Sequence, residues 1–200
     1  MLAAFDKFKG TISAQDAGQC ALDALSAFFS QHDMSIQGEV VPMADGGDGF
    51  LPALLDAYSL TRVNVTARGP LGLDIQSHYG ISADRSVAVI EMAEVSGLHL
   101  VPMHQRNPLN TTTYGFGQLI RHAVEHYNVK SVLLGLGGSA TCDGGLGALQ
   151  ALGVVFTMKK QGEENSVESS SEILKGKDVC NVISARLPSP PHHENCCRCR

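Results

Sequence analysis

The residues best suited to chemistry lie in a glycine-rich stretch at 137–145, which reads GGSATCDGG. An apolar run at 131–136 precedes it and an apolar repeat follows it, so the pattern predicts a strand, a glycine-rich loop and a helix in that order. Backbone N–H groups in such a loop can approach an anion closely, and the helix start adds a favourable dipole. Ser139 and Thr141 add hydroxyls, and Asp143 adds a carboxylate. The stretch is a candidate phosphate site, although a tight turn whose glycines serve only packing fits the same pattern.

Two further loops carry charged residues just after short apolar runs. Residues 6–11 (DKFKGT) contain Lys9, and residues 44–49 (ADGGDG) contain Asp45 and Asp48. Phosphoryl transfer needs this mixture, because cations and N–H groups neutralise phosphate oxygens while carboxylates hold Mg²⁺ or accept the proton of the attacking hydroxyl. Taken singly, the lysine could be a solvated surface residue and the acids could be ordinary turn residues. Their joint position after predicted strands favours a chemical role.

Composition narrows the class of protein. The chain has 200 residues, a net charge of -5 and 44% hydrophobic residues, which supports a packed core. It has no basic stripe and no apolar run near the ~20 residues of a membrane span, so neither nucleic acid nor membrane is expected as a partner. The first residues lack the pattern of a signal peptide, and the six cysteines do not resemble a disulfide framework. A cytoplasmic protein is therefore expected.

The apolar patterns alternate between strand and helix along most of the chain. Helices are expected at 13–28, 50–58 and 111–128, and strands at 38–42, 61–67, 75–81, 87–92 and 154–156. This order predicts an α/β fold with mainly parallel sheets and flanking helices. Ligands of such folds bind at the carboxyl ends of the strands, where Lys9, Asp45 and Asp143 are expected to lie.

Three parts of the chain are expected from these patterns. Residues 1–60 form the N-terminal part of one α/β lobe, and the run of strands from residue 61 indicates a second lobe at 61–157 that contains the glycine-rich loop. Residues 158–200 are expected to be a polar linker followed by a disordered, divergent tail.

A series of motifs, in order between Phe5 and Gly153, resembles type I glycerate kinases. These motifs are DKFKGTISA at 6–14, PMADGGDG at 42–49, GPLG at 69–72, VIEMA at 89–93, SGL at 96–98, RNPL at 106–109, TTTYG at 111–115 and GLGGSATCDGG at 135–145. The resemblance implies a two-lobed glycerate kinase I-like fold that is incomplete in this chain. It also implies transfer of the γ-phosphoryl group of ATP to D-glycerate, with Mg²⁺, to give phosphoglycerate.

The resemblance and the loop positions together suggest a role for each candidate residue. Asp45 and Asp143 are the predicted acidic pair for Mg²⁺ and for the attacking hydroxyl, and Lys9 is the predicted catalytic cation. Substrate contacts are expected from Lys9, Asp48, Arg106 and Thr112. Contacts to ATP are expected from Gly137, Gly138, Ser139, Ala140, Thr141 and Gly144.

The chain also departs from the family pattern. Cys142 stands where Asn is usual, and Asp48 stands where Glu is usual. Members of the family are longer, and the resemblance fades after Phe156, so a truncated form with impaired activity is expected. A non-catalytic α/β protein that binds a phosphate or nucleotide is the alternative.

A zinc hydrolase is a third possible class, and it depends on two short patterns. The HAVEH sequence at 122–126 fits a zinc-peptidase motif, but its two histidines are expected on the solvent side of a helix. The His- and Cys-rich run at 192–199 is a single short cluster, whereas structural zinc sites usually take paired ligands from two separated turns.

Overall fold

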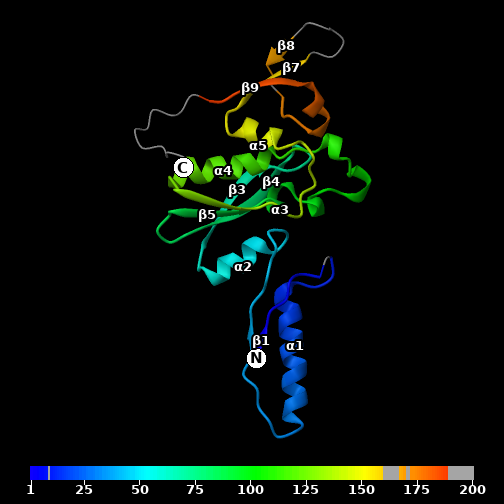
Figure 1. Cartoon of the computed structure of the whole chain (residues 1–200), viewed down its shortest axis with the longest axis vertical. Helices are drawn as coiled ribbons and strands as arrows, with labels where there is room; N and C mark the ends of the chain where they lie inside the picture. The colour runs from blue at the N-terminus through cyan, green and yellow to red at the C-terminus, as the bar shows by residue number, and fades with distance from the viewer. Residues whose placement is uncertain (9, 160–166, 170–171, 189–200) are drawn as a thin grey trace.

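The computed structural model describes residues 1–8, 10–159, 167–169 and 172–188, and Figure 1 shows its elements. The α-helices are α1 (Ala14–Ser30), α2 (Phe50–Ala57), α3 (Ala93–Ser96), α4 (Tyr114–Tyr127) and α5 (Leu146–Ala151). The strands are β1 (Leu2–Ala3), β2 (Glu39–Val40), β3 (Thr61–Arg68), β4 (Asp74–Ile81), β5 (Val87–Glu91), β6 (Ser131–Gly135), β7 (Val155–Lys159), β8 (Val167–Ser169) and β9 (Val182–Arg186). Short 3-10 helices are η1 (Leu98–Leu100), η2 (Met103–Gln105), η3 (Pro108–Asn110) and η4 (Gly176–Asn181).

A four-stranded sheet in the order β3-β4-β5-β6 forms the centre of the fold. α2 lies against one face, while α4 lies against the other face with α5 packed on it (Figure 1). The inner strand β5 is buried from Ala88 to Glu91. A strand covered on both faces needs apolar side chains on both, which the run VAVI provides. The main core lies between this sheet and α4 and consists of Ala67, Tyr79, Ile81, Ala88, Ile90, Val95, Phe116, Leu119 and Ala123.

This sheet is not mainly parallel, which corrects the expectation from the sequence. β3 pairs with β4 and β4 pairs with β5 in the antiparallel sense, while β5 and β6 are parallel. The connections at 69–73 and 82–86 are too short for a parallel crossover, which needs about a dozen residues or more. A parallel pair forms where a helix stands between the strands, as α4 does between β5 and β6.

The first part of the chain is a parallel pair of short strands, β1 and β2, with α1 packed along it. Ser13 caps α1, because its Oγ accepts a hydrogen bond from the N–H of Asp16 at 3.0 Å. The apolar face of α1 is largely exposed: 37% of Leu25 and 55% of Phe28 are accessible. An amphipathic pattern marks a face suited to burial without supplying the surface that covers it.

A second, antiparallel sheet in the order β8-β7-β9 lies beyond α5 (Figure 1). Its core is formed by Val154, Phe156, Met158 and Leu174. The structure therefore has ordered elements, η4 and β9, in part of the segment expected to be a linker. The boundaries proposed at residues 60 and 157 stay a prediction, and the run at 192–199 lies outside the described residues.

The helices of the described chain are short. α1 has 17 residues, two of which, Asp16 and Asp23, are acidic. In the part of the chain that the structure describes, no helix is both long and apolar enough to cross a bilayer.

Gly115→Ala tests the close packing of α4 on β3. A Cβ at Gly115 would overlap the carbonyl oxygen of Arg68, so we expect unfolding free energy to fall by about 1–3 kcal/mol. Helix propensity alone would favour Ala at this position by ~1 kcal/mol. Urea denaturation measures the change. The matched control is Gly69→Ala, whose Cβ would meet a flexible side chain at 3.2 Å. A Gly115→Ala protein as stable as wild type would contradict the packing.

Candidate active site

Two loops that are distant in the sequence meet backbone to backbone at the ends of β5 and β6. The N–H of Gly137 donates to the carbonyl oxygen of Gly46 at 2.8 Å. A Cβ at Gly137 would overlap the Cα of Gly47, and a Cβ at Gly135 would lie 2.9 Å from the Gly46 carbonyl oxygen. Glycine is required at both positions because no side chain fits between the two backbones. The glycine-rich loop and the loop before α2, both selected from the sequence, are therefore in direct contact.

A second set of contacts holds the glycine-rich loop against the segment that follows β5. The N–H of Leu98 donates to the carbonyl oxygen of Gly138 at 2.9 Å, and the N–H of Ala140 donates to the carbonyl oxygen of Ser96 at 2.8 Å. The hydroxyl of Thr111 donates to the carbonyl oxygen of Ala140 at 2.9 Å. The loop is thus fixed from two sides, as a preformed anion site requires.

Several donors of the glycine-rich loop remain unused. Gly138, Cys142 and Gly144 are exposed, and their N–H groups donate to no protein atom among the described residues. Gly138 and Gly144 have φ angles of 71° and 61°, and left-handed backbone of this kind forms anion-binding concavities. The hydroxyls of Ser139 and Thr141 lie 2.6 Å apart beside these donors. Such a set of neutral donors suits phosphate oxygens.

Asp143 is buried where the glycine-rich loop meets α4 and α5, with 1% of its surface exposed. Its Oδ2 accepts from the N–H and hydroxyl of Thr113, both at 2.8 Å, and from the N–H of Gly147 at 3.2 Å. Its Oδ1 accepts from the N–H of Gly145 at 3.1 Å. With four donors on one carboxylate, this geometry favours a role in holding the loop. The predicted part of Asp143 in catalysis and metal binding stays a prediction.

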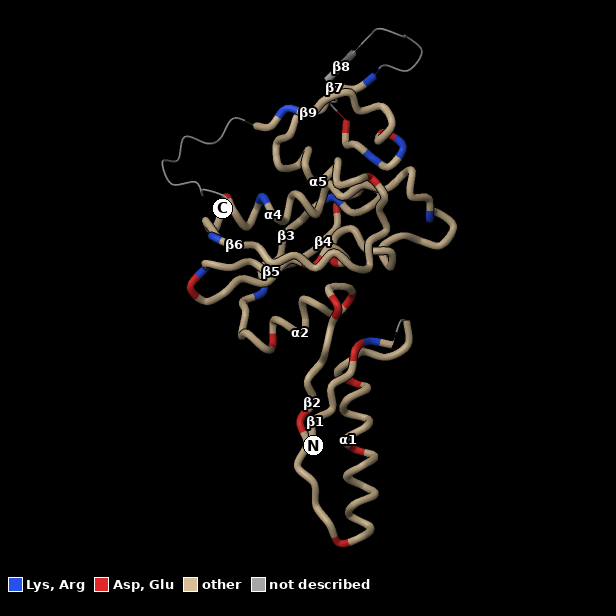
Figure 2. Tube along the Cα trace, viewed as in Figure 1, with Lys and Arg blue, Asp and Glu red and all other residues tan. Residues whose placement is uncertain are grey.

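Asp45 has the opposite surroundings, because 73% of its side chain is exposed. Its Oδ1 accepts from Nζ of Lys7 at 3.1 Å and from the N–H of Gly47 at 3.2 Å. The hydrogen bond from Lys7, followed by the one from Gly47, lowers the pKa of Asp45, so the carboxylate is ionised at neutral pH. Figure 2 shows the acidic and basic positions near this meeting of loops. Asp45 can therefore offer its Oδ2 to a proton or a metal ion.

Lys7 is the lysine that the structure brings to this site. Its Nζ also lies 3.7 Å from Asp6, and 19% of its side chain is exposed. Burial alone would lower the pKa of Lys7, but the hydrogen bond to Asp45 and the neighbouring carboxylates raise it above its ordinary value. The predicted Lys9 lies outside the described residues. The sequence DKFKG offers two lysines, and the pattern does not tell which one turns toward Asp45.

The remaining predicted substrate residues have different positions. Asp48 is brought to the glycine-rich loop, where a Cβ at Gly138 would overlap its Oδ1. Thr112 is fully buried, and its hydroxyl oxygen accepts from the N–H of Tyr114 at 3.1 Å. Arg106 is exposed and its Nε donates to a nearby carbonyl at 3.2 Å. Among the described residues, no hydrogen bond or ion pair joins Arg106 to the glycine-rich loop.

Glu91 belongs to the same site but was not among the predicted residues. It ends β5, has 1% of its surface exposed, and accepts hydrogen bonds from the N–H groups of Gly49 and Leu51 at the start of α2. Burial raises the pKa of Glu91 to about 7, although the two N–H donors oppose this shift. The sequence feature that could have identified Glu91 is an acidic residue directly after an apolar strand run.

The described residues contain no group of three or more His, Cys, Asp or Glu side chains placed to hold a metal ion. Asp45 suits Mg²⁺, because it has a free oxygen and Mg²⁺ often binds through one or two carboxylates together with substrate phosphates. Asp143 suits it less in this conformation, because its oxygens already have four donors.

The two histidines of the HAVEH helix have other partners. His122 and His126 stack with ring centroids 4.1 Å apart, and Nδ1 of His122 lies 3.0 Å from the hydroxyl of Tyr79. Glu125 pairs with Arg121 at 2.7 Å. His126 is exposed as expected, while His122 is half-buried. This helix therefore gives the zinc-hydrolase alternative no support.

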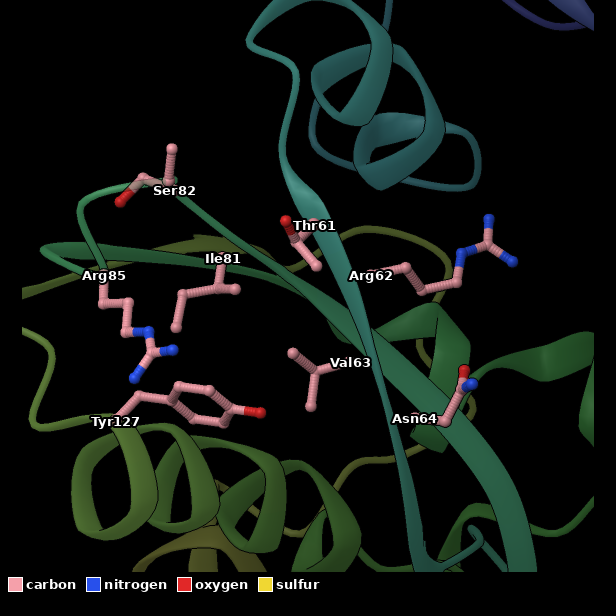
Figure 3. Close-up of a pocket in the computed structure, with 9 residues that line it drawn as sticks. Thr61, Arg62, Val63, Asn64, Ile81, Ser82, Arg85 and Tyr127 are labelled. Carbon is pink, nitrogen blue, oxygen red and sulfur yellow. The ribbon is translucent and has the colours of Figure 1, made fainter.

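A pocket of about 490 Å³ lies at the other end of the central sheet, where β3 begins and β4 ends. Figure 3 shows Val63, Ile81 and Tyr127 on one side of β3, with Arg85 beside them. The guanidinium of Arg85 lies 5.8 Å from the ring centroid of Tyr127. None of the predicted site residues lines this pocket. The pocket and the candidate site therefore lie at opposite ends of the central sheet.

Comparison with known proteins identifies the family. A model described as the glycerate kinase family matches residues 1–184. The chain belongs to the glycerate kinase family. The match continues past Phe156, where the resemblance was expected to fade.

Individual relatives of the chain support the assignment to the glycerate kinase family. A glycerate kinase from Halalkalibacterium halodurans is 45% identical over 158 residues, which are 79% of this chain and 40% of the relative. A glycerate 2-kinase from Escherichia coli K12 is 41% identical over 148 residues, or 74% of this chain and 38% of the relative. A crystal structure described as glycerate kinase 2 from Salmonella typhimurium LT2 has a TM-score of 0.67 and 36% identity, over 92% of this chain and 47% of that one. The chain thus spans about 40% of the length of these curated relatives.

Asp143→Asn should destabilise the protein strongly. The new amide NH₂ would face N–H donors, and each hydrogen bond to a charged group contributes about 1.5–3 kcal/mol, so we expect a loss of roughly 2–4 kcal/mol in unfolding free energy. Chemical denaturation at pH 7 measures it. The matched control is Asp45→Asn, which removes an exposed charge and should leave stability close to that of wild type. Equal stability of the two variants would contradict the buried role of Asp143.

Proposed function

We propose that this chain is a glycerate kinase-like phosphotransferase that passes the γ-phosphoryl group of ATP to D-glycerate and forms phosphoglycerate. The observation that carries the proposal is the direct contact between the glycine-rich loop and the loop before α2. It brings a loop with unused N–H donors next to the loop of Asp45, an ionised and exposed carboxylate. Membership of the glycerate kinase family supports ATP and glycerate as the substrates.

The glycine-rich loop binds the phosphates of ATP in this proposal. Backbone N–H groups of Gly138, Cys142 and Gly144 and the hydroxyls of Ser139 and Thr141 donate to phosphate oxygens. Gly137 and Ala140 contribute through their own hydrogen bonds, which hold the loop against its neighbours. The predicted ATP set of Gly137, Gly138, Ser139, Ala140, Thr141 and Gly144 is retained, with Cys142 added.

Asp45 is the proposed acceptor for the proton of the attacking glycerate hydroxyl. As the hydroxyl oxygen bonds to the γ-phosphorus, the bond to the bridging oxygen breaks, ADP leaves, and the hydroxyl proton passes to the carboxylate. Alternatively, the same free oxygen of Asp45 would hold Mg²⁺ together with the phosphates, and the ion would neutralise charge that develops on the phosphate oxygens. Asp143 keeps the loop in position and is retained as a candidate second acid.

Cations and polar groups near this loop are proposed for the carboxylate end of glycerate. Lys7 lies beside Asp45, and Lys9 is proposed from the sequence alone. Asp48 is proposed to bind a glycerate hydroxyl beside Gly138, and Arg106 to contact the substrate anion. Thr112 supports the site from within, because it is fully buried.

Impaired activity is proposed for residues 1–200 taken alone, because this stretch spans about 40% of the length of the curated relatives. The alternative is a non-catalytic protein that binds ATP through the same loop. The two differ in one measurable property, which is glycerate-dependent release of ADP.

Asp45→Asn should lower kcat for glycerate-dependent ADP release by about 100-fold or more, because it removes the carboxylate proposed as proton acceptor or metal ligand. A coupled ADP assay with Mg²⁺, ATP and D-glycerate measures kcat, and isothermal titration measures ATP affinity. Asp56→Asn, an exposed acid on α2, is the control and should leave kcat unchanged. A fall of less than roughly tenfold would reject the role of Asp45. ATP binding without any ADP release in the wild-type chain would favour the non-catalytic alternative.

A further inference from the structure

Glu91 is a buried acid that is held by backbone N–H groups. Its Oε2 accepts from the N–H of Leu51 at 2.7 Å, and its Oε1 accepts from the N–H of Gly49 at 3.2 Å. No ion pair with Lys, Arg or His joins it among the described residues. Burying a carboxylate without a cation is costly, and here the compensation comes from the first N–H groups of α2 and the dipole of that helix.

The position of Glu91 links both loops of the site. The adjacent residue, Met92, donates its N–H to the carbonyl oxygen of Gly135 at 2.8 Å. Gly135 is also the register partner of Glu91 across β5 and β6. Two residues later, Gly137 donates to Gly46. One continuous set of hydrogen bonds therefore runs from α2 through Glu91 to the glycine-rich loop and back to the loop before α2.

We infer that Glu91 is a positioning residue that fixes the Asp45-containing loop against the glycine-rich loop and thereby sets the affinity of the site for ATP. The inference rests on the proposed function for the identity of the ligand. The positional part does not, because it concerns the link between α2 and β5. Asp45 lies four residues before Gly49, so a shift of the first turn of α2 moves its carboxylate relative to the N–H donors of the opposite loop.

The pH dependence of this link follows from the surroundings of Glu91. Burial disfavours its ionised form more than the two N–H donors favour it, so the closed arrangement binds the proton more tightly than an open one in which the carboxyl is solvated. The charged groups that face Glu91 are Glu94 from α3 and Asp48 from the loop before α2, and both raise its pKa. The residue opposite Glu91 on β6 is Gly135, which has no charged side chain. Since burial raises the pKa of Glu91 to about 7, the link should weaken as pH rises from 6 to 8.

Glu91→Gln tests the link by hydrogen exchange of the peptide that covers residues 44–55. The variant presents an NH₂ to one of the two N–H groups, so we expect protection at pH 8 to fall by about tenfold or more, while peptides from β3 and β4 keep theirs. Protection factors, corrected for intrinsic exchange, should fall from pH 6 to pH 8 in the wild type and stay flat in the variant. Glu125→Gln is the control, because this exposed acid on α4 pairs with Arg121 and makes no hydrogen bond to α2 among the described residues.

A ligand measurement separates positioning from simple stability. Titration with Mg²⁺ and ATP should give an affinity about tenfold weaker for Glu91→Gln than for wild type at pH 8, with Glu125→Gln close to wild type. Unchanged protection of residues 44–55 in Glu91→Gln, or an equal loss in Glu125→Gln, would overturn the inference. If Glu91→Gln does not fold, the wild-type pH profile decides, and a flat profile rejects the inference. Absence of ATP binding in the wild type would reject the proposed function, while the exchange data would still test the link.

Discussion

The contact between two glycine backbones is the constraint on which the site depends. Gly46 and Gly47 lie against Gly135 and Gly137 so closely that a single Cβ would separate them. For this contact to form, β5 and β6 must end level with one another, and α2 must begin at the same edge of the sheet. The parallel β5–β6 pair, which is the exception in a mostly antiparallel sheet, supplies that common edge.

Three acids near this edge show that residue type alone does not reveal a role. Asp143 and Glu91 are both buried, and both accept hydrogen bonds from the first N–H groups of a helix. Asp45 is mostly exposed and keeps an oxygen free. The sequence pattern selected Asp45 and Asp143 together because each precedes a Gly-Gly pair. Burial separates them, and burial is set by packing partners that lie elsewhere in the chain.

Much of the local structure was predictable from the sequence, because it depends on neighbouring residues. The Ser13 cap of α1, the glycine at position 153 after α5, and the strand before the glycine-rich loop all follow from short patterns. The direction of the strands in the central sheet does not follow from the alternation of strands and helices. It is set by the short links at 69–73 and 82–86, which allow only antiparallel pairing. The exposed face of α1 does not follow from its pattern either, since periodicity describes one helix and burial needs two surfaces.

The phosphate-binding part of the site is held by contacts made within this chain. Ser96, Leu98 and Thr111 hold one side of the glycine-rich loop, and Gly46 holds the other. Asp143 fixes the start of α5 below it. The residues that hold the proposed ATP-binding N–H groups in place therefore all lie between positions 46 and 147. Transfer to glycerate requires a second substrate to be oriented as well, and orientation can account for a large part of a reaction barrier. Binding of ATP and turnover are thus separate properties of this chain, and loss of turnover alone would leave the structural basis of phosphate binding intact.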